Sequence, residues 1–352
     1  MSTINHYKSR RREYVMKYNA EKKQAIVSYI MEKIISKTPS LSKAVSETFE
    51  ISTNTVHGYI NELLEAGIIA KPKRGEYELV SVRNDYTFSR GKGELASDTY
   101  AYDVCLEKQI EHLPENVKHI WLYAVSEMVN NVIDHSEAEN MYVTVIRNYP
   151  ETQVIIKDDG VGIFEKIKRY FSLPNLDEAI CELFKGKLTT DENNHSGEGI
   201  FFTSKMMDKF SIFSSGKVFT TSKYDNADVC DANEDGKGTC VVMALSNFTQ
   251  RSAKEIFDAY SNTDGTFATT RIPMKNIFDS APVSRSQAKR VCNRLDEFEE
   301  VILDFADISW MGQGFAHQMF VVYVKAHPEI SIKTENMNDS VTNMYNHVVN
   351  SV

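Results

Sequence analysis

Polar side chains interrupt an apolar helical pattern between Ile120 and Ser136. This stretch reads IWLYAVSEMVNNVIDHS, and its apolar residues recur at the spacing of a buried helix. Glu127 and Asn131 are four residues apart, so a helix places both on one face, one turn apart. Burying a polar group without a partner costs about 1–3 kcal/mol, and a charge costs more. The two side chains therefore satisfy one another or face a ligand that is not part of the chain.

A carboxylate and an amide at this spacing suit phosphoryl chemistry. Mg²⁺ keeps several of its waters while it bridges phosphates, so the single amide oxygen of Asn131 is an adequate protein ligand. The carboxylate of Glu127 can act as a general base toward a water or a hydroxyl that is in line with a γ-phosphate. These roles make Glu127 the candidate catalytic residue and Asn131 the candidate metal ligand.

Three glycine-containing segments follow this helix along the chain. KDDGVGI (Lys157–Ile163) comes directly after a predicted strand, and HSGEGIFF (His195–Phe202) comes directly before a predicted helix. GKGT (Gly236–Thr239) stands at the entrance to a further predicted strand. A single Gly-x-Gly usually just makes a turn, but the three segments in this order after an acid–Asn helix are much more specific.

With these signals the middle of the chain resembles the GHKL ATPases, the superfamily of DNA gyrase, heat-shock chaperones, mismatch-repair proteins, sensor histidine kinases and anti-sigma-factor kinases. SEMVNNVIDH is most similar to the anti-sigma and gyrase versions, in which an acid precedes the asparagine by four. The resemblance implies a Bergerat-type α/β sandwich that binds ATP and Mg²⁺, with the carboxylate of Asp158 accepting a bond from the adenine amino group. The nucleotide-binding positions that it implies are Asn131, Asp158, Gly160, Gly162, Gly197, Gly199 and Thr239.

The segment before Gly197 is polar and resembles the mobile lid of this superfamily. Gly197 and Gly199 precede a predicted helix, whose N-terminal amides suit phosphate oxygens. Lys185 and Lys187 flank the start of the polar segment, where lysines either meet phosphates or remain solvated. Thr239 matches the Gly-Thr pair that lines the adenine side in the superfamily.

Residues 20–80 are predicted to form three helices and a hairpin, which resembles a winged helix-turn-helix. Residues 1–84 carry nine Lys and five Arg against nine Glu, a charge of +5 within a chain of net charge −9. The resemblance implies double-stranded DNA as a partner. The alternative is a protein-docking module with solvated lysines. The candidate DNA-binding residues are Ser52, Thr53, Asn54, Thr55 and His57 for bases, and Lys71, Lys73 and Arg74 for phosphates.

The C-terminal part alternates predicted helices and strands, which indicates α/β packing around a small sheet. EEVILDFADISWMGQGFAHQMF resembles STAS domains, the modules of anti-sigma-factor antagonists. Trp310 and Met311 stand where those antagonists carry a phosphorylatable serine. A regulated module and a purely structural interaction module both remain open. An anti-sigma-like ATPase and an antagonist-like domain in one chain suggest a cis-regulatory pair, and the STAS-like domain is the candidate surface for a regulatory protein partner.

The composition places few other limits on function. With 42% hydrophobic and 25% charged residues, the sequence is typical of a soluble globular protein, and no apolar run approaches the roughly 20 residues of a membrane span. Five scattered cysteines predict neither a disulfide framework nor a zinc site and favour a cytoplasmic location. The sequence leaves a homodimer open.

These observations predict an α+β and α/β multidomain protein. The expected boundaries are a winged helix at 1–85, a linker at 86–102, a GHKL-type ATP-binding domain at 103–250 and a STAS-like α/β domain at 263–352. The expected function is ATP-dependent regulation, in transcription or defence, with slow ATP hydrolysis coupled to DNA binding. The alternatives are a protein serine kinase of anti-sigma-factor type and a nucleotide-sensing module that does not hydrolyse ATP.

Overall fold

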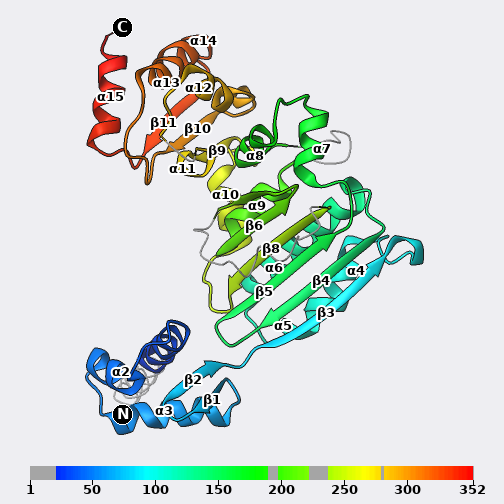
Figure 1. Cartoon of the computed structure of the whole chain (residues 1–352), viewed down its shortest axis with the longest axis vertical. Helices are drawn as coiled ribbons and strands as arrows, with labels where there is room; N and C mark the ends of the chain where they lie inside the picture. The colour runs from blue at the N-terminus through cyan, green and yellow to red at the C-terminus, as the bar shows by residue number, and fades with distance from the viewer. Residues whose placement is uncertain (1–20, 189–196, 222–236, 279–280, 352) are drawn as a thin grey trace, which may run out of the picture. The chain divides into compact units, whose positions relative to one another are not determined.

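The computed structural model describes residues 21–188, 197–221, 237–278 and 281–351 (Figure 1). The chain divides into two compact units. The first contains Met1–Arg83 together with Ile146–Thr152, and the second contains Asn84–Val145 together with Gln153–Val352. Each unit has its own hydrophobic core, and each is described by itself.

The first unit has the predicted order of three helices and a hairpin. A helix over residues 21–35 is followed by α2 (Leu41–Phe49), α3 (Thr53–Glu65) and the antiparallel strands β1 (Ile69–Lys73) and β2 (Glu76–Leu79). Its core contains the fully buried side chains of Ile30, Val45 and Val56. Ser52 caps α3, because its hydroxyl accepts a hydrogen bond from the backbone N–H of Thr55.

The second unit is built on a six-stranded sheet in the order β3-β4-β5-β8-β6-β7. Burial alternates along β5, as expected for a strand that has only one face covered, whereas almost every residue of β8 is buried. The strands are β3 (Val82–Ser89), β4 (Asn140–Arg147), β5 (Glu151–Asp158), β6 (Lys209–Ser214), β7 (Lys217–Thr220) and β8 (Thr239–Ser246).

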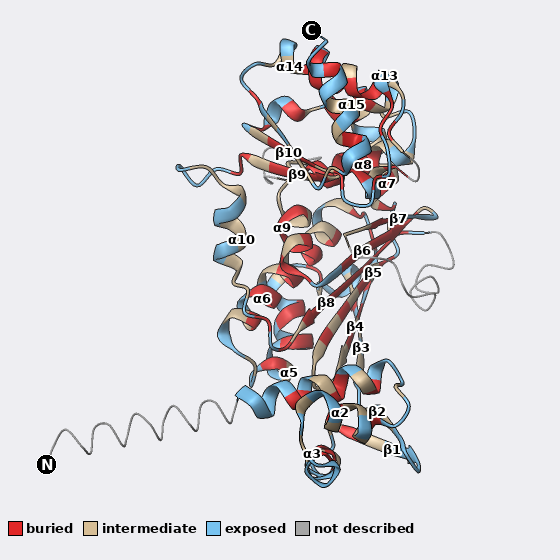
Figure 2. Ribbon diagram, turned by 90° about the vertical axis from the view of Figure 1, so that its left-hand side faces the viewer, coloured by how far each residue is buried: buried red, intermediate tan, exposed pale blue. Residues whose placement is uncertain are grey.

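Helices α6 (Glu115–Asn130) and α9 (Gly199–Met206) cover one face of this sheet, and buried residues gather where they meet it (Figure 2). The helical path of α6 continues through a π-turn, η3 (Asn131–His135). Two further helices, α7 (Ile163–Tyr170) and α8 (Leu176–Lys185), follow β5. The large buried side chains Trp121, Phe164, Phe201 and Phe202 belong to the core of this layer.

The segment 86–102, which was predicted to be a linker, contains regular secondary structure. The second half of β3 lies inside it, and this strand forms an edge of the six-stranded sheet. Helix α4 (Asp98–Tyr102) also lies inside it and packs against α6. Phe88 and Leu95 are nearly fully buried. The segment looks polar along the chain because only isolated positions face the core, and the pairing of β3 with β4 is long-range.

The C-terminal module, from β9 to α15, has a parallel three-stranded sheet in the order β11-β10-β9. The sequence predicts β10 and β11 but misses β9. Along the chain, α10 (Ala253–Tyr260) comes between the last strand of the six-stranded sheet and this module, and it begins with a capping box formed by Ser252 and Glu255. The module consists of β9 (Thr269–Pro273), α11 (Met274–Ile277), α12 (Arg285–Cys292), β10 (Glu300–Asp304), α13 (Gln313–His317), η6 (Gln318–Tyr323), α14 (Val324–Ala326), β11 (Ser331–Glu335) and α15 (Asp339–Val349).

Among the described residues, no helix has both the length and the apolar character that crossing a membrane requires.

Candidate functional site

A cavity of about 270 Å³ lies in the second unit, between the sheet and the helices α6, α7, α8 and α9. Its volume is close to the lower end of small-molecule sites, which is about 300 Å³. Apolar side chains such as Ile156, Ile212 and Val241 form much of its wall. The predicted site residues that line it are Glu127, Asn131, Asp158, Gly162, Gly197, Gly199 and Thr239. The structure therefore brings together residues from four separate segments of the chain.

Asp158 is the buried acid of the cavity. Its side chain ends β5 and is only 3% exposed, and burial raises the pKa of its carboxyl to about 6. Hydrogen bonds from Gly160 and Thr239 oppose this rise in the pKa. The N–H of Gly160 donates to Asp158 Oδ1 over 2.8 Å. A buried carboxylate that lines an apolar pocket is suited to accept a hydrogen bond from a ligand.

Glycine is required next to Asp158 because the backbones approach closely there. Gly160 does not line the cavity, but a Cβ on it would lie 2.0 Å from the carbonyl oxygen of Ser136, at the end of the α6 path. Gly162 has a φ of +82°, which favours glycine, and a Cβ on it would lie 2.7 Å from Ser214 Oγ. The next amide, Ile163 N–H, bonds to Thr239 Oγ1 over 3.0 Å. The Gly-x-Gly turn and the start of β8 thus hold Asp158 from two sides.

Glu127 and Asn131 line the opposite wall of the cavity from one helical path. Both side chains are half-buried, and the backbone N–H of Asn131 bonds to the carbonyl oxygen of Glu127. A Cβ on Gly199 would lie 2.0 Å from Glu127 Oε2, so only glycine leaves room for this carboxylate at the first turn of α9. The N-terminus of α9 is also where phosphate oxygens are predicted to bind. Glu127 is therefore next to the expected position of the phosphates.

Gly197 connects this turn to the segment that follows α8. It has a φ of +71°, and its carbonyl oxygen accepts a hydrogen bond from Leu188 N–H over 3.0 Å. A Cβ on Gly197 would lie 2.5 Å from the carbonyl carbon of Leu188. The predicted lid is the polar stretch between these two residues, and residues 189–196 lie outside the described part of the chain.

Several cavity residues were missed by the sequence prediction, and Lys166 is the clearest of them. It belongs to α7, where Ile163, Lys166 and Ile167 line the cavity at helical spacing. Its ammonium group donates to the carbonyl oxygen of His135 over 2.6 Å. The sequence signal that could have identified Lys166 is its position on the apolar face of the short helix that follows the Gly-x-Gly turn. Glu198, the residue before α9, also lines the cavity.

Lys185 corrects one expectation at the start of the predicted lid. It neither lines the cavity nor lies in solvent, because its side chain is buried against the C-terminal module. Lys185 pairs with Glu182, three residues earlier in α8. The sequence does not reveal that this pair is buried, because a Glu and a Lys at this spacing are usually found on an exposed helix face.

The candidate DNA-binding residues belong to the first unit, whereas the residues that line the cavity belong to the second. Those predicted to meet bases stand at the N-terminus of α3 or within its first turns and are exposed. Ser52 also caps α3, since its hydroxyl accepts a hydrogen bond from the backbone N–H of Thr55. Lys71 lies over the ring of Tyr77, and Lys73 pairs loosely with Glu76 over 3.9 Å.

Comparisons with known proteins agree with this arrangement. Residues 118–248 match the histidine kinase-, DNA gyrase B- and HSP90-like ATPases, and residues 287–342 match a STAS-like domain of unknown function. The anti-sigma F factor of Bacillus cytotoxicus is 34% identical over 125 residues, which cover 34% of this chain and 73% of that protein. The anti-sigma F factor of Bacillus thuringiensis is 32% identical over the same length and with the same coverage.

The chain therefore belongs to the histidine kinase-, DNA gyrase B- and HSP90-like ATPase family, and its central domain is an ATPase domain of this type. The C-terminal module is STAS-like.

Proposed function

We propose that this protein is an ATP-dependent regulator that binds Mg-ATP in the cavity and hydrolyses it slowly. The observation that carries this proposal is the cavity itself, which Asp158, Asn131, Glu127 and the first residue of α9, Gly199, all line. The buried carboxylate fits an adenine amino group, and the glycines at Gly197 and Gly199 leave backbone accessible to phosphates. The donor set contains one amide oxygen for the metal, which fits Mg²⁺ bridging phosphates.

Each residue then has a defined task. Asp158 orients the adenine by accepting a hydrogen bond from its amino group. Asn131 would hold Mg²⁺, which supplies charge neutralisation on the phosphates. Glu127 takes the proton from the attacking water as a general base. Its carboxylate lies against Gly199 in the first turn of α9, next to the expected position of the phosphates.

The proposal is tested by ATP binding to Asp158→Asn. Ionised Asp158 is the best acceptor for a hydrogen bond from the adenine amino group, so we expect the ATP-induced rise in Tm at pH 8 to be lost in this variant. In the wild type, ATP affinity should weaken as the pH falls through about 6, since Asp158 becomes protonated there. Calorimetry and thermal unfolding with Mg-ATP provide the measurements.

The same variant should not destabilise the ligand-free protein. The rise of the Asp158 pKa from 3.8 to about 6 means that the ionised form costs about 3 kcal/mol at neutral pH. The folded protein binds the proton more tightly, so the stability contributed by this group falls as the pH rises from about 4 to 6. Asp158→Asn should therefore leave the ligand-free Tm at pH 8 unchanged or raised.

Asp159→Asn is the matched control. Burial works to raise the pKa of Asp159, but hydrogen bonds from Asn140 and Glu139 hold it below its usual value. Its Oδ1 accepts from the N–H of Glu139 over 2.9 Å and from that of Asn140 over 3.0 Å. Asp159→Asn should lower the ligand-free Tm and retain the shift with ATP. An ATP shift that survives in Asp158→Asn would contradict the assignment of the adenine site.

A second candidate is phosphoryl transfer to a serine of a partner protein, with Glu127 as the base toward the serine hydroxyl. The likeness to anti-sigma F factors favours a protein partner. Label from [γ-³²P]ATP that appears on a captured protein, rather than as free phosphate, would support this candidate over hydrolysis.

We propose that the first unit binds double-stranded DNA as a winged helix. The exposed N-terminal turn of α3 and the basic β1–β2 tip support this assignment. Lys73→Ala combined with Arg74→Ala should weaken DNA binding and reduce the slope of log affinity against log salt by about 2. Lys22→Ala with Lys43→Ala removes equal charge from exposed positions elsewhere in the unit. Equal effects of the two pairs, or no binding by the wild type at low salt, would overturn the proposal.

A further inference from the structure

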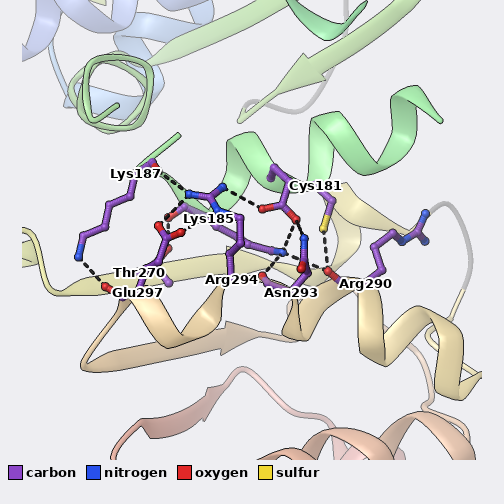
Figure 3. Close-up of polar contacts among 9 residues, drawn as sticks. Cys181, Lys185, Lys187, Thr270, Arg290, Asn293, Arg294 and Glu297 are labelled. Carbon is purple, nitrogen blue, oxygen red and sulfur yellow. Dashed lines mark hydrogen bonds and ion pairs between the residues drawn. The ribbon is translucent and has the colours of Figure 1, made fainter. Parts of the chain in front are cut away.

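The contact between α8 and the C-terminal module contains a buried ionic cluster, formed by Glu182, Lys185, Asn293 and Arg294 (Figure 3). Lys185 is fully buried and Glu182 is 1% exposed, and their charged groups are 2.7 Å apart. Burying two charged groups is costly, so nearly all hydrogen-bonding positions of the ammonium group and the carboxylate must be filled.

The C-terminal module fills these positions. The ammonium group of Lys185 donates to the carbonyl oxygens of Asn293, over 2.6 Å, and Arg290, over 3.1 Å. Glu182 accepts from Asn293 Nδ2 over 2.9 Å and from Arg294 Nη1 over 3.1 Å. The two buried charges of this cluster in α8, Glu182 and Lys185, therefore bond to residues more than 100 positions later in the chain. This makes the docking geometry specific.

Arg294 extends this cluster toward the cavity. Its second terminal nitrogen, Nη2, donates to the carbonyl oxygen of Lys187, and the ammonium group of Lys187 donates to Glu297 O over 2.6 Å. Lys187 has a φ of +49°, a conformation that costs a non-glycine residue about 1 kcal/mol or more. The C-terminal module thus binds Lys187 at both its backbone and its side chain and holds it in this strained conformation.

Lys187 lies between two residues of the cavity wall, Gly186 and Leu188. Gly186 is wedged against the rest of the unit, since a Cβ on it would lie 2.9 Å from the Phe267 ring and 3.0 Å from the Phe201 ring. On the other side, Leu188 N–H bonds to the carbonyl oxygen of Gly197. A continuous series of contacts therefore runs from Arg294 to the turn that places Gly199 beside Glu127.

We propose that Arg294 is a positioning residue for the phosphate end of the ATP site, acting from the STAS-like module through Lys187. The inference rests on the proposed function of the cavity. Arg294 suits the role because its planar guanidinium group donates hydrogen bonds both to the Glu182 carboxylate and to the carbonyl oxygen of Lys187. The adenine end, at Asp158, is held by β5 and β8 and does not depend on this contact.

The test compares the affinities of ATP and adenosine, both with Mg²⁺, for the full chain by calorimetry. Arg294→Ala should weaken ATP binding at least about fivefold, the lower end of typical coupling between sites. Adenosine reaches only the Asp158 end, so its affinity should be unchanged. Arg285→Ala, an exposed arginine of α12, is the control and should alter neither affinity.

Arg294→Lys provides a second variant if Arg294→Ala does not fold. It keeps a charge near Glu182 but cannot make both bonds, so it too should lose ATP affinity selectively. Wild-type affinities in both Arg294 variants would overturn the inference alone, as would equal losses for ATP and adenosine, which indicate general damage. A wild type that binds neither ligand would overturn the proposed function and this inference with it.

Discussion

Glu127→Gln should reduce phosphate release by about 10²–10⁴-fold, the contribution of a positioned general base. The amide has nearly the same shape as the carboxylate and fits the space that Gly199 leaves at the first turn of α9. Mg-ATP affinity should therefore change little, since Asp158 and Asn131 are intact. Steady-state phosphate release and ATP calorimetry measure the two effects separately. A fall in rate without a fall in affinity is the result expected of a base.

Glu198→Gln is the control for this experiment, because Glu198 lines the same cavity and carries the same charge. Its rate should stay within a few-fold of the wild type. If Glu198→Gln slowed hydrolysis and Glu127→Gln did not, the base would have been assigned to the wrong carboxylate. If Glu127→Gln lost transfer to a protein while release to water was negligible in every variant, the kinase candidate would replace hydrolysis.

Lys185→Met should lower the free energy of unfolding by about 3–5 kcal/mol, the usual cost of removing one partner from a buried ion pair. Methionine has a similar length, so the loss arises mainly from Glu182, which loses its nearest cation, and from the carbonyl oxygens of Asn293 and Arg290, which lose the bond from the ammonium group. The change should appear in urea unfolding as a lower midpoint with an unchanged m-value.

Lys254→Met is the matched control for Lys185→Met. Lys254 pairs with Asp258 on an exposed face of α10, with side chains 81% and 62% exposed. Such surface pairs contribute about 0–1 kcal/mol, so this variant should unfold close to the wild type. Equal midpoints for the Lys185 and Lys254 variants would show that the buried cluster does not stabilise the docking of the C-terminal module.

Much of the ATPase-like layer was predictable because its signals are local. The helical spacing of Glu127 and Asn131 places both on one wall of the cavity, and the strand before the Gly-x-Gly turn ends at Asp158, as expected. Lys166 was missed because a single lysine at a helix position usually faces solvent. The π-turn after Asn130 was missed because periodicity reports apolar spacing and not which carbonyl accepts each N–H.

Elements whose partners are distant in the chain were the harder ones to predict. The strand β9, TTRIP, is short and mostly polar, and it becomes a strand by pairing in parallel with β10 about 30 residues later. The strand β3 escaped prediction for the same reason, since it is ordered by the pairing that places it next to β4.

The sequence by itself determined that Glu127 and Asn131 share a helix face and that Asp158 ends a strand before a glycine turn, because helix and strand periodicity and glycine placement are properties of neighbouring residues. Only the tertiary structure decided that Lys185 and Arg294 serve the contact between two modules. Their charges look solvated along the chain, and only the docking of the segment from Arg290 to Glu297 onto α8 supplies the partners that make their burial favourable.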